Sequence, residues 1–425
     1  MAKLRVKNFG PIKEGFSEND GFMEITPVTV ICGNQATGKS TIAKLYSTLT
    51  WLEKSLVKSS LGKKTIPETD FVSFCSEQRL HEYFIDSTEI EYIGETCIFT
   101  YKNKKFNLDF VNDFNTALKK YNRPKIMYIP SERNLLAAID DAENIKNLPL
   151  MLSILLEEYN RAKKKSETGM FELPISNVKL LYDSNSLTTK VLTENGEINI
   201  LNSSSGIQSV APLSLVTRFL ANSITTDFLG NLKLLSINER NQIKDWLLQN
   251  TENQEDAEMT VNLFNQLLYG QRVSDSIKNK LSILLHFFFN TCFINIVEEP
   301  EQNLYPESQG KVLFELLECL NTNKNNQLII TTHSPYMLSY LTQSAKAAEL
   351  LQKGVPAEKI EKIVPVKSTV SGEKISIYET KEDGSIKLLK PYEGLPSDEN
   401  LLNEALASGN ERFASLLDLE EAFCQ

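Results

Sequence analysis

The sequence has little of what an exported, membrane-bound or metal-clustering protein needs. Its first residues, MAKLRVKNFGPIKEG, carry charge, Gly or Pro every few positions and lack the apolar core of a secretory signal. The longest apolar run, over 281–297, is broken by polar residues, so we expect a helix end and a strand there, not a membrane span. Six cysteines show no Cys-x-x-Cys or similar spacing, which is typical of reduced thiols. We therefore predict a cytoplasmic protein without a membrane partner.

Positive charge is also scarce. The chain has 45 Lys and Arg against 55 Asp and Glu, and a net charge of -10 argues against a surface that binds phosphate backbones everywhere. No internal repeat or long heptad run is present, so a long coiled-coil arm is not expected. Four basic clusters remain, each of which is either part of a DNA-facing rim or a solvated face. They are Lys63/Lys64, Lys102/Lys104/Lys105, Lys119/Lys120/Arg123/Lys125 and Arg161/Lys163/Lys164/Lys165.

A phosphate-binding pattern is present near the start. The stretch GNQATGKS over 33–40 fits G-x-x-x-x-G-K-[ST], follows an apolar strand and opens a helix, which is the context that a P-loop requires. Glycines let the backbone wrap phosphates at a helix N-terminus, with Lys39 reaching the β- and γ-phosphates and Ser40 binding Mg²⁺. A chance match in a Gly/Thr turn is the alternative. The predicted contacts to ATP are Gly33, Asn34, Gln35, Ala36, Thr37, Gly38, Lys39, Ser40 and Thr41.

Two adjacent carboxylates end a second apolar strand, in FINIVEEPEQNLYP over 293–306. Paired carboxylates are costly at a buried strand end without a cation, although a solvated turn is the alternative. In P-loop enzymes such acids hold Mg²⁺ and orient the attacking water. We assign Glu298 to the metal and Glu299 to the water. His333, after the strand in LIITTHSP, would lie at the same sheet edge, within reach of a γ-phosphate.

A Ser-rich helix start, NSSSGIQS over 202–209, is by itself only a helix N-cap with glycine. In order, however, GNQATGKST, SSGIQS, VEEPEQNLYP and TTHSP resemble an ABC-type ATPase head. They are most similar to the OLD-like (overcoming lysogenization defect) ATPases, which are related to the SMC and RecF-type ATPases. Transporter heads usually carry Leu-Leu-Asp-Glu-Pro, whereas EEPE-x-x-L-x-P followed by THSP is typical of the OLD-like group. The resemblance covers about 1–50 and 125–363.

This resemblance implies roles for particular residues. Glu299 matches the catalytic glutamate, His333 the switch histidine, and the segment from Glu301 to Tyr305 the loop after Walker B. Four residues of the ABC signature would contact ATP held by a second subunit, which implies a head-to-tail dimer with two ATP molecules between the heads. These residues are Ser204, Ser205, Gly206 and Gln208.

Three departures from the family pattern bear on hydrolysis. Glu298 stands where Asp is usual, and the signature lacks its Leu and second Gly. No clear Q-loop glutamine is present. The turn PSERN, with Glu132 and Arg133, either takes that place or forms a surface salt bridge.

The implied function is an Mg²⁺-dependent ATPase whose dimerisation, or higher homo-oligomerisation, gates a partner. OLD nucleases continue into a metal-binding Toprim domain, but no E…DxD arrangement follows His333. The chain therefore resembles stand-alone ATPase subunits of bacterial anti-phage systems, which work beside a separately encoded effector, expected to be a nuclease. Two alternatives stay open. One is a RecF-like ATPase acting on DNA ends or gaps, and the other is a nucleotide-gated scaffold with very slow hydrolysis.

The predicted fold class is α/β. Strand and helix alternate after residue 293, the pattern that builds a parallel sheet. With the resemblance, this predicts a P-loop NTPase of the ABC-ATPase head type, a mixed sheet with flanking helices, a β-hairpin and helical insertion, and a helical signature lobe. The expected divisions are 1–50 (P-loop part of the head), 51–124 (insertion), 125–205 (head continuation with β-hairpins), 206–292 (helical signature lobe), 293–390 (Walker B and switch-histidine half) and 391–425 (C-terminal helical tail).

Overall fold

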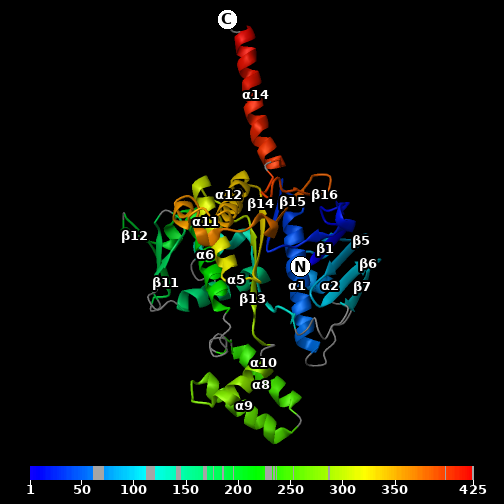
Figure 1. Ribbon diagram of the computed structural model, residues 1–425, viewed down its shortest axis with the longest axis vertical. Coiled ribbons are helices and arrows are strands. Elements are labelled where there is room, and N and C mark those ends of the chain that lie inside the picture. The colour runs from blue at the N-terminus through cyan, green and yellow to red at the C-terminus, as the bar shows by residue number, and fades with distance from the viewer. Residues whose placement is uncertain are drawn as a thin grey trace.

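The fold was analysed in a computed structural model (Figure 1). It describes the chain except residues 61–70, 112–119, 140–144, 166–169, 176, 184–185, 195, 225–231, 233–234, 236, 252, 286–287, 398 and 424–425. Lys63, Lys64 and Lys119 of the basic clusters therefore lie outside the described residues. A central body carries a small helical lobe at one end and a single projecting helix at the other.

A seven-stranded sheet forms the centre of the body. Its strand order is β2-β16-β15-β4-β14-β13-β8, and the five strands from β15 to β8 run parallel. Every residue of β4 and β13 is buried, as expected for parallel strands covered on both faces. The strands are β2 (Gly15–Phe16), β16 (Ser385–Leu388), β15 (Ile375–Thr380), β4 (Val28–Gly33), β14 (Gln327–Thr332), β13 (Cys292–Glu298) and β8 (Pro124–Ile129).

The two faces of this sheet contact different helices because side chains alternate along each strand. Val28 and Val30 of β4 face the larger core, whereas Ile31 faces the second core. The second core contains the helix that follows the P-loop, α1 (Lys39–Ser60). The larger core contains α5 (Leu150–Lys165), α6 (Ser205–Ser223), α11 (Pro306–Asn321) and α12 (Pro335–Gln352). The mixed α/β sheet with flanking helices that the sequence predicts is thereby confirmed.

The predicted insertion is joined to the N-terminus through a second sheet, with strand order β3-β1-β5-β6-β7. It contains β3 (Met23–Glu24), β1 (Lys3–Phe9), β5 (Phe84–Ile93), β6 (Cys97–Lys102) and β7 (Lys105–Phe110), all antiparallel. The meander β5 to β7 therefore extends a sheet that starts with β1. A short helix, α2 (Phe71–Glu77), precedes it.

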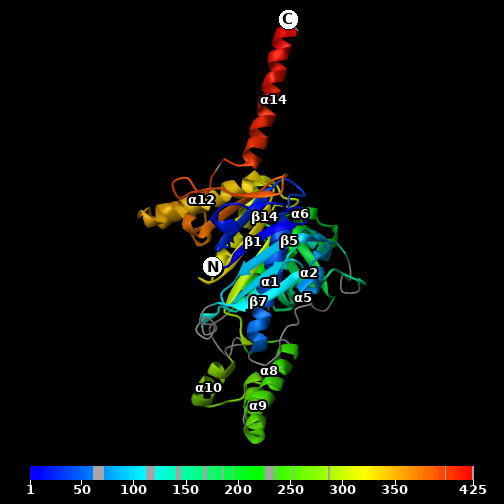
Figure 2. The ribbon, with the colours of Figure 1, turned by 90° about the vertical axis from the view of Figure 1, so that its right-hand side faces the viewer.

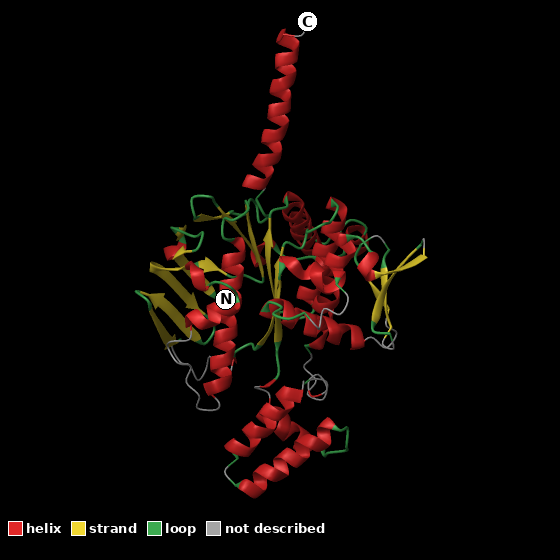
Figure 3. Ribbon diagram, turned by 180° about the vertical axis from the view of Figure 1, so that it is seen from behind, coloured by secondary structure: helices red, strands yellow, loops and turns green. Residues whose placement is uncertain are grey.

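A third sheet, β12-β11-β10-β9, is antiparallel and lies at the opposite side of the body (Figure 3). Its strands are β9 (Met170–Glu172), β10 (Lys179–Asp183), β11 (Thr188–Thr193) and β12 (Gly196–Asn199). The remaining short helices are α4 (Leu135–Ala138), α13 (Ala357–Glu361), η1 (Asn19–Gly21), η3 (His81–Tyr83), η4 (Ser131–Asn134), η6 (Ile200–Asn202), η8 (Val366–Ser368) and η9 (Gly372–Lys374).

The helices predicted over 206–292 belong to two different cores. Helix α6 packs in the larger core of the head. By contrast, α8 (Ile237–Asn250), α9 (Gln254–Leu268) and α10 (Asp275–Leu285) share a small core of their own. This lobe lies at one end of the molecule, and α14 (Leu401–Phe423) projects from the other (Figures 1 and 2). Across the described residues, no helix has both the length and the apolar character needed to cross a membrane.

A buried carboxylate attaches the β5–β6 turn to α1. Glu53 is 2% exposed and accepts hydrogen bonds from the Tyr92 hydroxyl at 2.8 Å, the Thr96 hydroxyl at 2.8 Å and the backbone N–H groups of Thr96 and Cys97 at 2.6 and 3.2 Å. A Cβ on Gly94 would lie 2.3 Å from a Glu53 carboxylate oxygen. Burial raises the pKa of Glu53, and these four donors oppose that shift. The carboxylate thus fixes the antiparallel sheet to the helix that carries the P-loop.

We predict that Glu53→Ala lowers the free energy of unfolding by about 2–4 kcal/mol, because several buried donors lose a carboxylate acceptor. Chemical denaturation measures this change. Glu82→Ala is the control, since the Glu82 side chain is 85% exposed and its removal should change stability by less than about 0.5 kcal/mol. Equal losses in the two variants would contradict the structural role of Glu53.

Candidate nucleotide site

The P-loop connects the end of β4 to the start of α1. Gly33 has φ 140° and Gly38 has φ 101°, conformations that favour glycine. A Cβ on Gly33 would lie 2.3 Å from the carbonyl oxygen of Thr380, at the end of the neighbouring strand β15. Ala36, between the two glycines, also has a positive φ of 60°. The first of these glycines is therefore required by close packing as well as by backbone conformation.

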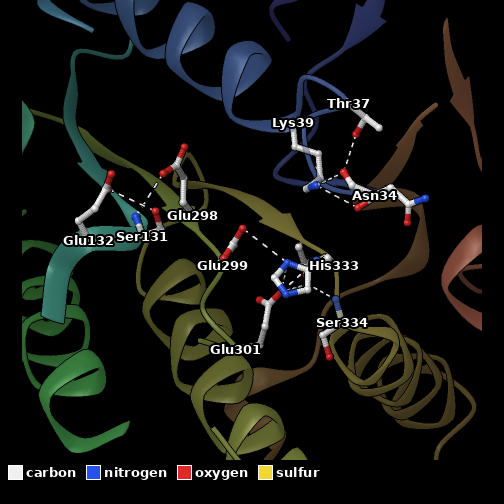
Figure 4. Close-up of polar contacts among 12 residues, drawn as sticks. Asn34, Thr37, Lys39, Ser131, Glu132, Glu298, Glu299, Glu301, His333 and Ser334 are labelled. Carbon is white, nitrogen blue, oxygen red and sulfur yellow. Dashed lines mark hydrogen bonds and ion pairs between the residues drawn. The ribbon is translucent and has the colours of Figure 1, made fainter. Parts of the chain in front are cut away.

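The Lys39 side chain folds back over the P-loop (Figure 4). Its side chain is 6% exposed, and Nζ donates to the carbonyl oxygens of Gly33 at 2.9 Å and Asn34 at 2.5 Å. Burial lowers the pKa of Lys39, and the charge of Glu299 is the largest effect opposing that shift. Phosphate oxygens are stronger acceptors than these carbonyls, and the first N–H groups of α1 have no helical turn before them. The loop therefore fits the phosphates of ATP.

Strand β15 holds the P-loop from the side. The Thr37 hydroxyl lies 2.8 Å from the Asn34 carbonyl oxygen and 2.6 Å from the Thr380 hydroxyl, which also donates to the Cys32 carbonyl at 3.1 Å. Asn34 donates its amide to Glu382 at 3.0 Å. Gln35 is exposed and Thr41 is buried. Sequence patterns gave no signal for Thr380, which is 343 positions from its partner Thr37.

Glu298 ends strand β13 with its carboxylate buried. It is 4% exposed and accepts a short hydrogen bond from the Tyr128 hydroxyl of β8 and another from the Ser131 N–H at 3.2 Å. Burial and the neighbouring carboxylate hold the pKa of Tyr128 well above its ordinary value. These two hydrogen bonds from adjacent elements thus offset part of the free-energy cost of burying the Glu298 carboxylate.

The predicted Mg²⁺ ligands are Ser40, half-buried in the first turn of α1, and Glu298. In the part of the chain that the structure describes, no group of three or more His, Cys, Asp or Glu side chains forms a metal cluster. Mg²⁺ is commonly held by one or two protein oxygens together with phosphates and water. One hydroxyl and one carboxylate therefore fit an ion that arrives with ATP.

Glu299 and His333 contact each other at the ends of β13 and β14. Nδ1 of His333 is 3.5 Å from Oε1 of Glu299, and the side chains are 40% and 30% exposed. This contact lowers the pKa of Glu299 and raises that of His333. Glu299 has φ 43°, a left-handed conformation, and its N–H donates to the Thr331 carbonyl at 2.9 Å. The strand therefore turns sharply here and aims the second carboxylate at the histidine of the next strand.

Glu301 contacts His333 and holds it in position. One carboxylate oxygen accepts from the Thr332 hydroxyl at 2.7 Å and the His333 N–H at 2.9 Å, and it lies 3.7 Å from His333 Nδ1. The residue is 5% exposed, and burial raises its pKa. Its other oxygen, Oε2, is buried without a hydrogen-bond partner among the described residues. Sequence analysis placed Glu301 only in the loop after Walker B, although the third acid in EEPE was a signal for this role.

Arg133 joins the paired glutamates to the signature helix. Its side chain is fully buried and donates to the carbonyl oxygens of Glu298 and Glu299 at 2.7 Å each, Ser209 at 3.2 Å and Pro130 at 3.3 Å. Burial lowers its pKa to about 10, so the guanidinium stays charged at neutral pH. The surface salt bridge considered for the PSERN turn is therefore wrong for Arg133, because a fully buried side chain binds backbone carbonyls there.

The predicted signature residues begin α6, where Ser204 accepts a capping hydrogen bond from Ile207 N–H at 3.5 Å. Ser204 and Ser205 are exposed. A Cβ on Gly206 would lie 2.8 Å from the Asn303 carbonyl oxygen, so this glycine lets the helix approach the loop after β13. Gln208 is 8% exposed and donates to the carbonyls of Ile200 and Leu201 at 3.1 Å each. Its amide is therefore bonded within its own chain.

Several residues of the predicted basic clusters pair with carboxylates of the same chain. Lys102 contacts Glu89 at 2.7 Å, Lys104 contacts Asp86 at 2.7 Å, and Lys125 and Arg161 contact Glu158 at 2.6 and 3.0 Å. Arg123 is 7% exposed and donates to the Phe289 carbonyl oxygen at 2.8 Å. The ion pairs partly neutralise these basic residues within their own chain. The DNA-facing rim therefore stays a prediction, and the ion pairs reduce its support.

Comparison with known proteins matches one family model, and the solved structures similar to the chain include two SMC heads. The AAA ATPase domain family matches residues 283–338, which include β13, α11 and β14. An SMC head bound to the C-winged helix domain of ScpA is 10% identical, with a TM-score of 0.37 and coverage of 91% of this chain and 95% of that chain. The SMC head domain from Thermotoga maritima is 11% identical, with a TM-score of 0.36 and coverage of 93% and 98%. No curated protein matches the chain.

The site and the matched segment together define an ATPase of the P-loop class. The matched segment contains both paired glutamates and His333, while the P-loop lies outside it and is recognised by its own geometry. Within that class, the carboxyl ends of three neighbouring parallel strands, β4, β14 and β13, carry the candidate residues.

We predict that Arg133→Lys lowers the free energy of unfolding by about 2–4 kcal/mol. A lysine keeps the charge but cannot reach the Glu298, Glu299 and Ser209 carbonyls together, so buried acceptors lose their donors. Denaturant unfolding measures the change. Arg412→Lys, at an exposed position of α14, is the matched control and should change stability by less than about 0.5 kcal/mol. A loss no larger than that of the control would refute the role of the guanidinium.

Proposed function

We propose that this protein hydrolyses ATP with Mg²⁺ at the P-loop edge of the central sheet and that the nucleotide cycle gates a partner protein. The observation that carries the proposal is the convergence of Lys39, Glu298, Glu299 and His333 at the ends of adjacent parallel strands. Phosphoryl transfer depends mainly on positioning and charge stabilisation, and these four side chains are the types that supply both.

Each residue has a distinct task in this proposal. Lys39 leaves the two loop carbonyls to bind phosphate oxygens, while Ser40 and Glu298 hold Mg²⁺. The metal ion would neutralise phosphate charge. Glu299 orients the attacking water and accepts its proton. His333 stabilises the charge on the γ-phosphate, and Glu301 holds the histidine in place.

In the same proposal, two heads associate head-to-tail around two ATP molecules. The exposed Ser204 and Ser205 would contact the nucleotide of the second subunit, together with Gly206 and with Gln208 once its amide is released from its own chain. The support is the order of the four motifs and their similarity to the OLD-like group. By that similarity the partner is a separately encoded effector, a nuclease, in anti-phage defence.

A nucleotide-gated scaffold with very slow hydrolysis is the second candidate, and one observation favours it. The Glu299 carboxylate faces an imidazole whose pKa is raised, and the charge of that imidazole weakens the carboxylate as a base. In a scaffold, Glu299→Gln would leave assembly and activity unchanged. A RecF-like repair ATPase would instead bind DNA ends or gaps in an ATP-dependent manner, which the paired basic residues favour less.

We predict that Glu299→Gln lowers the rate of ATP hydrolysis by about 10²–10⁴-fold and leaves ATP binding intact, because general-base catalysis contributes on that scale. Phosphate release measures turnover, and a fluorescent ATP analogue measures binding. The oligomeric mass with ATP should be larger for the variant than for the wild type, since ATP stays in place.

Lys39→Ala is the control for the P-loop, because it removes the phosphate contact and should abolish both binding and turnover. Very slow turnover in the wild type that is unchanged in Glu299→Gln would leave the scaffold as the better account. Failure of the wild type to bind ATP at all would contradict the P-loop assignment.

The rate of hydrolysis should fall as pH rises through the pKa of His333. That pKa is raised above its ordinary value of 6.5 by Glu299 and Glu301, with burial and the charge of Lys39 opposing, so the charged form persists above pH 6.5 and is lost at higher pH. The pKa of Glu299 is lowered from 4.5, so this carboxylate stays ionised over the same range. A pH–rate profile of wild type and His333→Gln tests this, and the alkaline limb should disappear in the variant. A rate that rises with pH would show that the imidazolium restrains Glu299.

A further inference from the structure

The C-terminal helix α14 is unusual in having almost no contact with its own chain. It contains 23 residues, of which only Leu402 is buried, and it points away from the body in both views (Figures 1 and 2). A single helix of this length is marginally stable in water, since most helical stability in proteins comes from packing. The exposed face of α14 therefore requires a partner surface.

That face is apolar along one side. Leu406, Phe413, Leu417 and Phe423 are 53%, 63%, 47% and 81% exposed. The spacing of seven and four positions places Leu406, Phe413 and Leu417 in one line on a helix, whereas Phe423, six positions further on, lies about 120° away from that line. Leu416 lies beside the same line and is 62% exposed. A stripe of this kind is what a helix presents when it lies in a hydrophobic groove.

The charge of α14 is strongly negative. Five carboxylates and one arginine lie along it, and three of the carboxylates, Asp418, Glu420 and Glu421, cluster beside the apolar stripe near its end. A partner groove should therefore be apolar in its floor and basic at its rim.

A groove with these properties lies on the same chain, between α5, α6 and β9. It has a cavity volume of about 250 Å³, and its lining includes Ala162, Phe171, Leu215 and Phe219. Lys165 lines it as well, with Nζ 5.4 Å from the centre of the Phe219 ring. The cavity is large enough for an aromatic side chain such as that of Phe413.

The rim of this groove is positively charged. Arg218 lines it and pairs with Glu315 at 2.7 Å, and Lys165 lines it from the last turn of α5, which also carries Lys163 and the exposed Lys164. Lys164 borders the neighbouring cavity on α5 and is not among the residues that line this groove. The groove thus combines an apolar floor with a basic rim, which is complementary to α14 in both respects.

We propose that α14 of one molecule docks in the α5–α6–β9 groove of a second copy of this chain. The helix leaves its own body at Leu402 and extends about 35 Å, so it is placed to reach a neighbouring molecule. Phe413 and Leu417 occupy the groove, and Glu420 and Glu421 face Lys164 and Lys165. Each copy carries both surfaces, so the contact is heterologous. It is separate from the ATP site and needs no nucleotide.

The full-length protein tests this proposal without nucleotide, by analytical ultracentrifugation over a range of concentrations. Wild type should associate reversibly, and added salt should weaken the association. Phe413→Ser should weaken it at least about tenfold. Two charge-reversal variants should each weaken it about tenfold: the tail variant Glu420→Lys/Glu421→Lys and the groove variant Lys164→Glu/Lys165→Glu. Glu358→Lys, an exposed change on α13, is the matched control and should have no effect.

Two combinations make the test specific. A chain with both reversals has a basic helix and an acidic rim, so association should return. An equimolar mixture of tail and groove variants has one intact helix and one intact groove, so it should form a pair that neither variant forms alone. Because no nucleotide is present, Lys39→Ala should associate as wild type does, whether or not the protein hydrolyses ATP.

Two results would overturn the proposal. If the wild type stays monomeric at every concentration, the binding partner of α14 is a different protein and not a second copy of this chain. Association that persists equally in the tail and groove variants, without recovery specific to the double reversal, would place the contact between copies elsewhere. Thermal unfolding of each variant, which should match wild type within a few degrees, shows that any lost association is not a loss of folding.

Discussion

The buried guanidinium of Arg133 is the interaction on which the candidate site depends. Two adjacent acids end a fully buried strand, which would be unfavourable in an apolar setting. Arg133 lies beneath them, binds the carbonyl oxygens of Glu298 and Glu299, and is attracted by the charges of Glu298, Glu299 and Glu301. Arg133 is thus a cation, supplied by the protein itself, next to the two glutamates. Through Ser209 the same guanidinium fixes the first turns of α6, so the paired glutamates and the signature helix share one rigid support.

The order of strands then determines which side chains can meet. Strand β14 lies between β4, which carries the P-loop, and β13, which carries the glutamates. His333 is consequently placed between Lys39 and Glu299, and both neighbours affect its pKa. Thr380 of β15 holds the loop from the other side of β4. The loop is therefore held by β15 on one flank of β4, which would reduce the rearrangement needed if phosphates replaced the carbonyl partners of Lys39.

Local patterns in the sequence predict the parts of this site that lie at strand ends. The P-loop, the paired glutamates and His333 each follow an apolar run, and parallel strands bring such ends to one edge. The roles of Arg133 and Thr380 depend on contacts with residues far away in the chain, and spacing alone does not reveal these. The helices over 206–292 show the same limit, because helical periodicity indicates a buried face but not which core receives it.

Charge is distributed unevenly in this acidic protein, and the distribution separates its two proposed contacts. The nucleotide site uses a single lysine that is 6% exposed, so its attraction to phosphate acts in a region where ions screen poorly. The carboxylates of α14 and the side chains of Lys164 and Lys165 are exposed, so their attraction is screened within about 10 Å at moderate salt. Salt should therefore distinguish the two proposed contacts: the proposed association of α14 with a second copy would weaken first, and the proposed contact of Lys39 with phosphate would be less affected.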